Sequence, residues 1–197
     1  MLKRTTDVAL SAIGLVISAP IAAVIAVAIK LDSGGPVIFR QERVGRGFRP
    51  FLIYKFRTMV ADAPRIGRAI TVGGDRRITR VGRFLRRTKL DELPQLINVL
   101  KGDMSLVGPR PELRKYVEAF RAEYERILTV RPGMTDLASL RFIDESSVLA
   151  RAGDPERAYV EWVLPEKIKL ARQYVDNSSL RMDLHLLGLT LARIISH

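Results

Sequence analysis

Residues 90–111, with the sequence LDELPQLINVLKGDMSLVGPRP, combine two adjacent acids, a helical pattern and an arginine between two prolines. Apolar residues recur at helical spacing after the acids, at Leu93, Leu96, Ile97 and Leu100. Gly102 ends this pattern, and Pro94 is tolerated only in the first turn of a helix. The stretch therefore predicts a helix that begins near Asp91, with Asp91 as its N-cap and Glu92 beside it.

The segment just before the two acids is strongly basic. Between Arg76 and Leu90 there are seven cations and no acid: Arg76, Arg77, Arg80, Arg83, Arg86, Arg87 and Lys89. The helix start and these cations are expected to favour ionised Asp91. An ionised carboxylate in such a field suits chemistry on a multiply charged anion such as a pyrophosphate, either by holding Mg²⁺ or by attacking phosphorus. The structural alternative is a plain N-cap followed by an exposed acid.

Length and composition favour one globular domain with an anionic partner. The chain has 197 residues and a formal net charge of +12, so nucleic acid, an anionic membrane face and phosphorylated substrates are all candidate partners. It has no cysteine and only two histidines, His185 and His197. Disulfides, thiolate metal sites and cysteine nucleophiles are thereby excluded, and carboxylates are expected to carry out most of any catalysis.

Residues 8–29 carry no charge, and this segment is long enough for a helix to cross a bilayer. A cleaved signal peptide and a simple spanning helix both fit this pattern. We favour a third interpretation, a re-entrant helix that enters one leaflet and returns. Pro20 predicts a kink, and Ser18 is placed to satisfy a freed backbone group. Basic residues flank the segment on both sides, so a re-entrant path keeps both flanks on the cytoplasmic side.

The rest of the chain predicts an α+β fold that is mostly helical, with one small β-hairpin. Strands are expected at 37–39 and 51–56, with a tight turn at 45–47 between them and a loop at 61–75 after them. Further helices are expected from Pro111 to the break at 131–133, at 155–176 and at 178–196. The last has a dense leucine face, which fits either a helix packed on the core or an amphipathic helix in the membrane interface.

Gly108-Pro109-Arg110-Pro111 is a second candidate for anion binding. Two prolines stiffen the backbone around Arg110, and each X–Pro bond is a candidate cis bond. A rigidly presented guanidinium suits bidentate binding of phosphate oxygens, although a simple connecting turn is the alternative. Lys55 alternates with aromatic residues in Tyr54–Met59, which fits either a half-buried strand with one basic face or a strand that stacks on nucleic acid.

Taken together, these motifs resemble the bacterial sugar transferase family, the monotopic phosphoglycosyl transferases of surface-glycan assembly. The resemblance extends over nearly the whole chain, and no single generic motif explains the order of its parts. The matching stretches are Phe39–Gly45, Tyr54–Met59, Arg76–Arg83, Leu90–Gln95, Asn98–Pro111 and Arg131–Thr135.

The resemblance implies a re-entrant membrane helix over residues 1–31 and a helical catalytic domain over residues 32–197, on the cytoplasmic face of the bacterial inner membrane. The implied reaction moves a sugar-1-phosphate from a UDP-sugar to polyprenyl (undecaprenyl) phosphate and releases UMP. It would be the first membrane step in assembly of an exopolysaccharide, O-antigen or glycoprotein. The implied partners are the UDP-sugar, the polyprenyl phosphate and the phospholipid membrane, without nucleic acid, and a homodimer is left open.

The same resemblance implies roles for single residues. Asp91 is expected to attack the β-phosphorus, to form a covalent phosphosugar–aspartate intermediate and to hold Mg²⁺. Glu92 is expected to assist proton transfer and to shape the metal site. Phosphate binding is implied for the residues Arg86, Arg110, Lys55, Pro109 and Pro111.

Two stretches depart from the family pattern. Many relatives break the membrane helix at Ser-Pro, whereas this chain has Ser18-Ala19-Pro20. After Thr135 many relatives continue Gly-Leu-Ala-Gln, whereas this chain continues Asp136-Leu137-Ala138-Ser139. Nucleotide and sugar contacts are therefore not transferred to that region, and the sugar is not assigned. Two other classes stay open as alternatives, namely a membrane-tethered nucleic-acid-binding protein and an inactive scaffold of a glycan-assembly complex.

Overall fold

The computed structural model describes residues 2–66, 70–142 and 149–195. Its helices and strands follow the chain in the order α1 (Leu2–Asp32), β1 (Ile38–Val44), β2 (Pro50–Phe56), α2 (Ala63–Ile66), α3 (Arg80–Arg87), α4 (Gln95–Lys101), β3 (Ser105–Val107), α5 (Arg114–Ala119), α6 (Arg121–Ile127), β4 (Gly133–Thr135), α7 (Leu137–Arg141), α9 (Pro155–Ala158), α10 (Leu164–Asn177) and α11 (Leu180–Ile195). Short turns complete them: the 3₁₀ turns η1 (Arg46–Phe48) and η2 (Leu90–Glu92), and the π-helical turn η3 (Tyr159–Val163). The predicted class, α+β and mostly helical, is confirmed.

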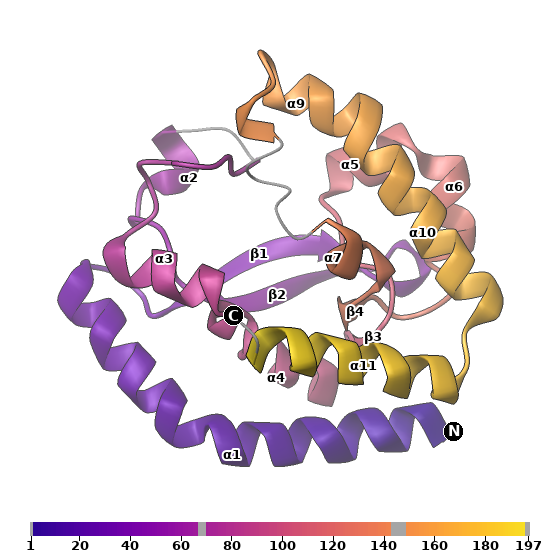
Figure 1. Ribbon diagram of the computed structural model, residues 1–197, viewed down its shortest axis with the longest axis horizontal. Coiled ribbons are helices and arrows are strands. Elements are labelled where there is room, and N and C mark those ends of the chain that lie inside the picture. The colour runs from indigo at the N-terminus through magenta and orange to yellow at the C-terminus, as the bar shows by residue number, and fades with distance from the viewer. Residues whose placement is uncertain (1, 67–69, 143–148, 196–197) are drawn as a thin grey trace.

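Helix α1 is continuous, bends near its middle and runs along one edge of the molecule (Figure 1). Pro20 lies inside it and has no N–H for the helical ladder, which accounts for the bend. Ser18 donates to the Leu15 carbonyl at 3.4 Å, one residue before the Val16 carbonyl that Pro20 leaves without its helical donor. By length and composition, α1 is the one helix among the described residues that could cross a membrane.

Both ends of α1 contact the same globular body. Near the N-terminus, Lys3 forms an ion pair with Asp183 of α11, with 2.6 Å between Nζ and Oδ2. Near the other end, the Asp32 carboxylate accepts a hydrogen bond from the Val81 N–H of α3 at 3.0 Å. Between these ends, many large apolar side chains are exposed: Ile13, Val16, Ile17, Ile21, Val24, Val27 and Leu31. One face of α1 is therefore an apolar surface along the edge of the molecule.

The predicted hairpin is confirmed as the antiparallel pair β1–β2, which lies in the centre of the molecule (Figure 1). Phe39 pairs with Lys55 in its register, and the strands extend as far as the pair Val44–Pro50. The connection is longer than the predicted turn at 45–47, because η1 continues to Phe48, which has a positive φ of 61°. Lys55 is thereby placed near the end of β2.

A second, parallel pair joins β3 to β4, and the sequence did not predict it. Ser105 pairs with Gly133, and Val107 pairs with Thr135. The backbones approach so closely here that a Cβ on Gly133 would lie 2.1 Å from the Gly108 nitrogen. No residue larger than glycine fits without moving the backbone, so this position fixes the loop that continues into Arg110.

Several predicted helices differ in extent from those observed. The helix expected from Pro111 begins at Arg114 and breaks at Phe120, whose φ of −123° and ψ of 40° are not helical. The helix expected at 155–176 is present as α9, η3 and α10, with the π-helical turn in its middle. The last helix is present as α11, although Ser196 lies outside the described residues. The predicted loop at 61–75 contains the single turn α2, and its residues 67–69 are also outside the described part.

The core has three clusters, and the acid pair lies where two of them meet. One cluster joins α5, α6 and α10, and a second joins α4, β3, α10 and α11. The third joins the end of α1 to β2 and α3. Leu90 and Leu93 pack against the third cluster, whereas Leu96 belongs to the second. The segment from η2 to α4 is therefore fixed on both sides of Asp91 and Glu92.

Candidate active site

Asp91 and Glu92 lie in the 3₁₀ turn η2, between α3 and α4. The prediction that Asp91 is a helix N-cap is wrong, because Pro94 occupies that position and α4 begins at Gln95. Lys89, with a left-handed φ of 59°, reverses the chain after α3, so the acids form a separate turn before the helix. Their orientation is therefore set by this turn and by packing of its leucines.

Glu92 accepts hydrogen bonds from two cations of distant segments. Its Oε1 lies 2.8 Å from Lys55 Nζ, at the end of β2, and 2.5 Å from Arg110 Nη2, in the loop after β3. Burial alone would raise the pKa of Glu92, but Arg110 and Lys55 outweigh it and hold that pKa well below its usual range. Glu92 is thus a fixed anion between two cations, and the structure brings together three of the residues that the sequence singled out.

Asp91 differs from Glu92 in the direction in which its pKa is shifted. Burial raises the pKa of Asp91, and the opposing charges of Lys55, Arg86 and Lys89 do not offset this effect. The cations favour ionised Asp91, as expected, but desolvation by burial is the larger effect and the net shift of its pKa is upward. The Asp91 carboxylate accepts no hydrogen bond from any described residue. It is a protonatable group without a fixed partner, as a nucleophile or metal ligand requires before substrate binds.

Arg86 contributes a third cation near the acids. Its Nε donates to the Thr58 hydroxyl at 2.8 Å, which orients the guanidinium. Burial lowers the pKa of Arg86 and the charge of Asp91 opposes that shift, so the two groups interact electrostatically. Its remaining N–H groups have no hydrogen-bond partner within the described chain, and they are available to an anion.

The peptide bonds before Pro109 and Pro111, on either side of Arg110, are both trans. The described residues contain no cis peptide bond, so the expectation of a candidate cis bond at Pro109 or Pro111 is wrong. The Pro109 carbonyl accepts from the Gly133 N–H at 2.9 Å, and the Pro111 carbonyl accepts from Arg43 Nη1 at 3.2 Å. Both prolines are therefore held in place by hydrogen bonds from neighbouring segments to their carbonyls.

Two buried polar residues near the site were not predicted. Asp136 accepts from the Arg110 N–H at 3.3 Å and from the Ser139 N–H at 2.7 Å. The same side chain therefore caps α7 and holds the backbone of Arg110. Asn98 of α4 accepts from the Tyr54 N–H at 3.0 Å and donates to the Leu52 carbonyl at 2.7 Å. For Asn98, the sequence signal was a polar residue inside the apolar run of its helix. For Asp136, it was an acid just before a short helical segment.

A bound divalent cation fits the donor set of the acid pair. No group of three or more Asp, Glu, His or Cys side chains in the described residues is arranged to hold a metal. Among the described residues, however, the Asp91 carboxylate has no hydrogen-bond donor, and both cations contact only Oε1 of Glu92, so its Oε2 has none either. Carboxylate oxygens that are completed by substrate phosphates are the usual ligands of Mg²⁺.

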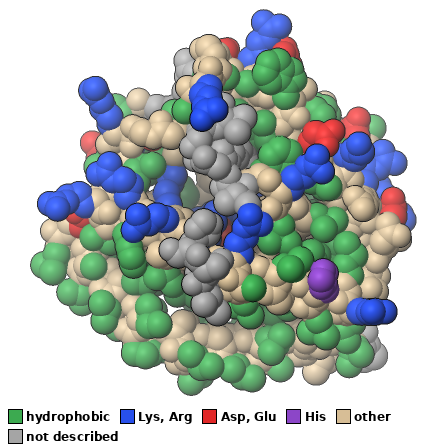
Figure 2. Space-filling view, in the orientation of Figure 1, with side chains coloured by type: hydrophobic (Ala, Val, Ile, Leu, Met, Phe, Trp, Pro, Cys, Tyr) green, Lys and Arg blue, Asp and Glu red, His purple; other side chains and the backbone are tan. Residues whose placement is uncertain are grey.

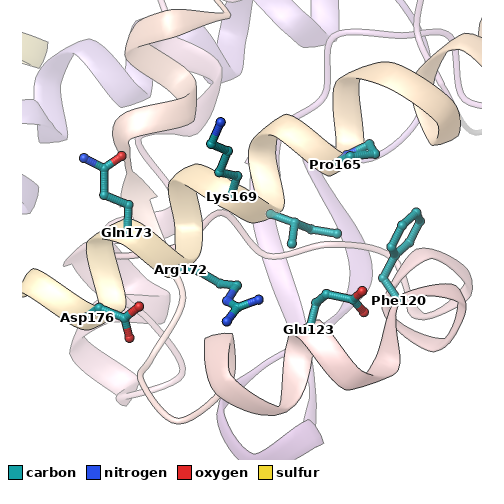
Figure 3. A pocket seen from close by; sticks show the side chains of 8 residues that line it. Phe120, Glu123, Pro165, Lys169, Arg172, Gln173 and Asp176 are labelled. Atoms are coloured by element: carbon teal, nitrogen blue, oxygen red, sulfur yellow. The ribbon is translucent and has the colours of Figure 1, made fainter.

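A separate pocket of about 420 Å³ lies between α6 and α10 (Figure 3). The residues that line it are Phe120, Glu123, Pro165, Ile168, Lys169, Arg172, Gln173 and Asp176. None of the site residues predicted from the sequence is among them, so this pocket is distinct from the acid pair.

The whole chain, residues 1–197, matches the family model described as bacterial sugar transferase. The chain belongs to the bacterial sugar transferase family. A relative from Aeromonas hydrophila, named UDP-N-acetylgalactosamine-undecaprenyl-phosphate N-acetylgalactosaminephosphotransferase, is 40% identical over 99% of this chain and 44% of its own length. The UDP-glucose:undecaprenyl-phosphate glucose-1-phosphate transferase of Caulobacter vibrioides is 49% identical over 71% of this chain and 53% of its own length.

A third relative, named uncharacterized sugar transferase EpsL, from Bacillus subtilis (strain 168), is 35% identical over 99% of this chain and 88% of its own length. The chain thus spans about half the length of the first two relatives and most of the third. The family assignment predicted from the order of the motifs is confirmed.

Proposed function

We propose that this chain transfers a sugar-1-phosphate from a UDP-sugar to undecaprenyl phosphate, releases UMP, and thereby begins assembly of a surface glycan. The names of two relatives support the two substrates, since each pairs a UDP-sugar with undecaprenyl phosphate. The observation that carries the proposal is the convergence of Lys55 and Arg110 on Glu92, directly beside Asp91. Such an array of cations around an unpaired carboxylate suits a diphosphate under nucleophilic attack.

In the first step, a carboxylate oxygen of Asp91 attacks the β-phosphorus of the UDP-sugar. The bond from that phosphorus to the bridging oxygen breaks, and UMP leaves with the oxygen and the bonding electron pair. In the second step, an oxygen of the lipid phosphate attacks the same phosphorus, and the Asp91 carboxylate leaves. Two displacements at one phosphorus give the lipid-linked diphosphate sugar and restore the protein.

The form of Asp91 that attacks is the ionised carboxylate, and burial raises the pKa at which that form appears. In the free protein, Arg110 binds Glu92, and an incoming diphosphate competes for the same guanidinium. When Arg110 turns to the diphosphate, Glu92 loses one of the two cations that hold its pKa low, and it becomes a base for the Asp91 proton. Substrate binding and activation of the nucleophile are therefore linked through Arg110.

Mg²⁺ is part of the proposal, with Asp91 and the Oε2 of Glu92 as its protein ligands. When bound, it would neutralise the phosphate oxygens and favour the ionised form of the acid pair. Arg86 and Arg110 bind the diphosphate from the protein side, and Lys55 keeps Glu92 oriented. These assignments rest on the free donors described above.

A re-entrant path of α1 on the cytoplasmic face is also proposed. A straight helix of the length of α1 extends about 46 Å, which would separate its two ends by the thickness of a membrane. Instead, Lys3 at one end and Asp32 at the other both contact the globular body. The bend at Pro20 and the exposed apolar face support insertion into a single leaflet.

Helix α11 is proposed to lie in the membrane interface beside α1. The two helices run along the same side of the molecule (Figure 1), where Figure 2 shows hydrophobic side chains along the lower edge with Lys and Arg above them. Leu184, Leu189 and Leu191 of α11 are exposed, whereas Leu186 is buried. An apolar outer face next to an inserted helix is typical of interfacial helices.

Single cysteines test this topology, because the chain has none of its own. Leu2→Cys and Gly34→Cys place thiols at exposed positions beyond the two ends of the apolar segment. Both are expected to react with an impermeant maleimide only from the cytoplasmic side of oriented vesicles. Labelling of the two positions from opposite sides would contradict the re-entrant path.

The function itself is tested by UMP release from a panel of UDP-sugars, with the membrane-reconstituted protein and undecaprenyl phosphate. The expected result is steady UMP formation with one or a few of the sugars, dependent on the lipid for multiple turnovers. Asp91→Asn is the inactive control, and Asp62→Asn, which changes an exposed acid, is the matched active control. Absence of UMP with every UDP-sugar would contradict the proposed function.

A further inference from the structure

The first turns of α1 contact the free edge of β3. The buried Asp7 carboxylate accepts hydrogen bonds from the Ser105 hydroxyl at 2.8 Å and the Leu106 N–H at 3.1 Å. On its other side β3 pairs with β4, where the Ser105 N–H donates to the Pro132 carbonyl at 2.8 Å. Asp7 thus satisfies an edge that would otherwise bind a further strand.

Lys3, one turn earlier, contacts the same edge of β3. Its ammonium donates to the Val107 carbonyl at 3.0 Å and to Asp183 at 2.6 Å. The Tyr174 hydroxyl joins them, because it donates to Asp183 at 2.6 Å and lies 3.1 Å from the Val107 carbonyl oxygen. The outer edge of β3 is therefore closed by charged side chains of α1 and by two C-terminal helices.

Arg4, next to Lys3, contacts the helix that follows the acid pair. Its Nη1 donates to the Val99 carbonyl at 2.6 Å, and its Nη2 donates to the Leu100 carbonyl at 3.0 Å. Both carbonyls belong to the last turn of α4, where the Val99 carbonyl also accepts from the Gly102 N–H at 3.0 Å. One short segment of α1 therefore contacts two elements that flank the Glu92–Arg110 ion pair along the chain, namely α4 after Glu92 and β3 before Arg110.

The connection from Asp7 to Arg110 is short and stiff. Only Val107, Gly108 and Pro109 separate Leu106 from Arg110 along the chain. The Gly108 N–H donates to the Thr135 carbonyl at 3.1 Å, and the Pro109 ring fixes its own φ. A shift of β3 is therefore transmitted to Arg110 and is not absorbed by a flexible loop.

We propose that Asp7 is a positioning residue for the reaction, whose two hydrogen bonds to β3 set the placement of Arg110 against the diphosphate of the substrate. The proposal rests on the proposed function, in which Arg110 binds that diphosphate. Helix α1 would then help to position an active-site residue, in addition to attaching the protein to the bilayer.

The test is a double-mutant cycle on full-length protein in phosphatidylglycerol vesicles, read as kcat/KM for UMP release. Asp7→Ala is expected to lower kcat/KM by about tenfold or more, because small displacements of a binding group have large kinetic effects. In an Arg110→Lys background, the further loss is expected to be under about threefold, because the residues act through one interaction. Asp7→Asn retains an acceptor for the Leu106 N–H and is expected to restore kcat/KM to within about threefold of wild type.

Asp32→Ala is the matched control. It removes the same side chain from the other end of α1, together with its hydrogen bonds to the Val81 N–H and the Thr79 side chain. Its effect is expected to be the same factor in the wild-type and Arg110→Lys backgrounds. A general loss of stability would behave in this additive way for Asp7→Ala as well.

The outcomes separate the two proposals. Wild-type kcat/KM in Asp7→Ala, or an equal loss in both backgrounds, overturns the positioning role. A wild-type protein that releases no UMP from any UDP-sugar overturns the proposed function instead. If Asp7→Ala leaves the membrane fraction or does not fold, Ser105→Ala, which removes one of the two hydrogen bonds, takes its place in the same cycle and is judged by the same criteria.

Discussion

Two regions of the molecule combine acids with cations, but they differ in burial. Around Glu92, side chains from β2, η2 and the loop after β3 meet, and the Glu92 side chain is only 15% exposed. Beside the pocket between α6 and α10, Arg126 and Asp176 form an ion pair at 2.9 Å, with side chains 58% and 48% exposed. Water already solvates the second pair, whereas the first must satisfy its charges internally. The buried cluster is therefore where substitution changes protonation and activity.

The largest effect is expected from Asp91→Asn, which should lower turnover by about 10³-fold or more because the nucleophile is lost. The same variant should be more stable than wild type at neutral pH. The folded state raises the pKa of Asp91 from 3.8, so wild-type stability falls as pH rises through the window above that value. Thermal unfolding at several pH values checks this, and the difference should shrink as pH falls toward 3.8. A wild type that is more stable than Asp91→Asn at pH 7 would contradict the raised pKa of Asp91.

Arg110→Lys should come next, with kcat/KM lower by about tenfold to a hundredfold, because lysine lacks the planar fork that binds two phosphate oxygens. Because lysine keeps the positive charge, the decrease in kcat/KM would measure the loss of the bidentate geometry of arginine. Arg126→Lys makes the same change in the exposed ion pair and should leave kcat/KM at the wild-type value. Equal values for Arg110→Lys and wild type would show that Arg110 does not bind the diphosphate.

The pH dependence of activity should follow Asp91 and not Glu92. Deprotonated Asp91 is the attacking form, and its pKa is raised from 3.8, so kcat/KM should increase with pH through a value above the ordinary range of aspartate. Glu92, whose pKa is held low, stays ionised over the same interval. A pH–rate profile from pH 4 to 8 checks this. A kcat/KM that does not change between pH 4 and 8 would show that the nucleophile does not titrate in this range.

The smallest effect is expected from Asp176→Asn, in the exposed region. Loss of the ion pair with Arg126 should change the free energy of unfolding by less than about 0.5 kcal/mol, because exposed pairs contribute little. UMP release should be unchanged. A tenfold decrease in activity would show that the pocket between α6 and α10 takes part in the reaction and would remove the contrast between the two regions.

Local patterns in the sequence predicted the hairpin, the long apolar helix and the importance of residues 90–111. They did not predict the parallel pair of β3 with β4, because each strand is three residues long and neither shows a periodicity. The part of Asp136 in fixing Arg110 depends on that pairing and was missed for the same reason. Long-range pairing of short segments is visible only after folding.

The pKa of Asp91 shows a second limit of what can be predicted from the sequence. Counting charges along residues 76–92 favours an ionised carboxylate, since the cations nearby are numerous. The fold buries Asp91 and directs Lys55 and Arg110 to Glu92 instead. Adjacent acids with the same sequence context thus have pKa values shifted in opposite directions.

The central claim is that Asp91 is a covalent nucleophile within the buried cluster. The most direct measurement is the intact mass of the protein after brief incubation with its UDP-sugar and Mg²⁺, without lipid, followed by acid quench. An added mass of one sugar phosphate, located on Asp91 by peptide mapping and matched by one equivalent of UMP, is the predicted result. Unchanged mass in a protein that still releases UMP when undecaprenyl phosphate is present would contradict the claim.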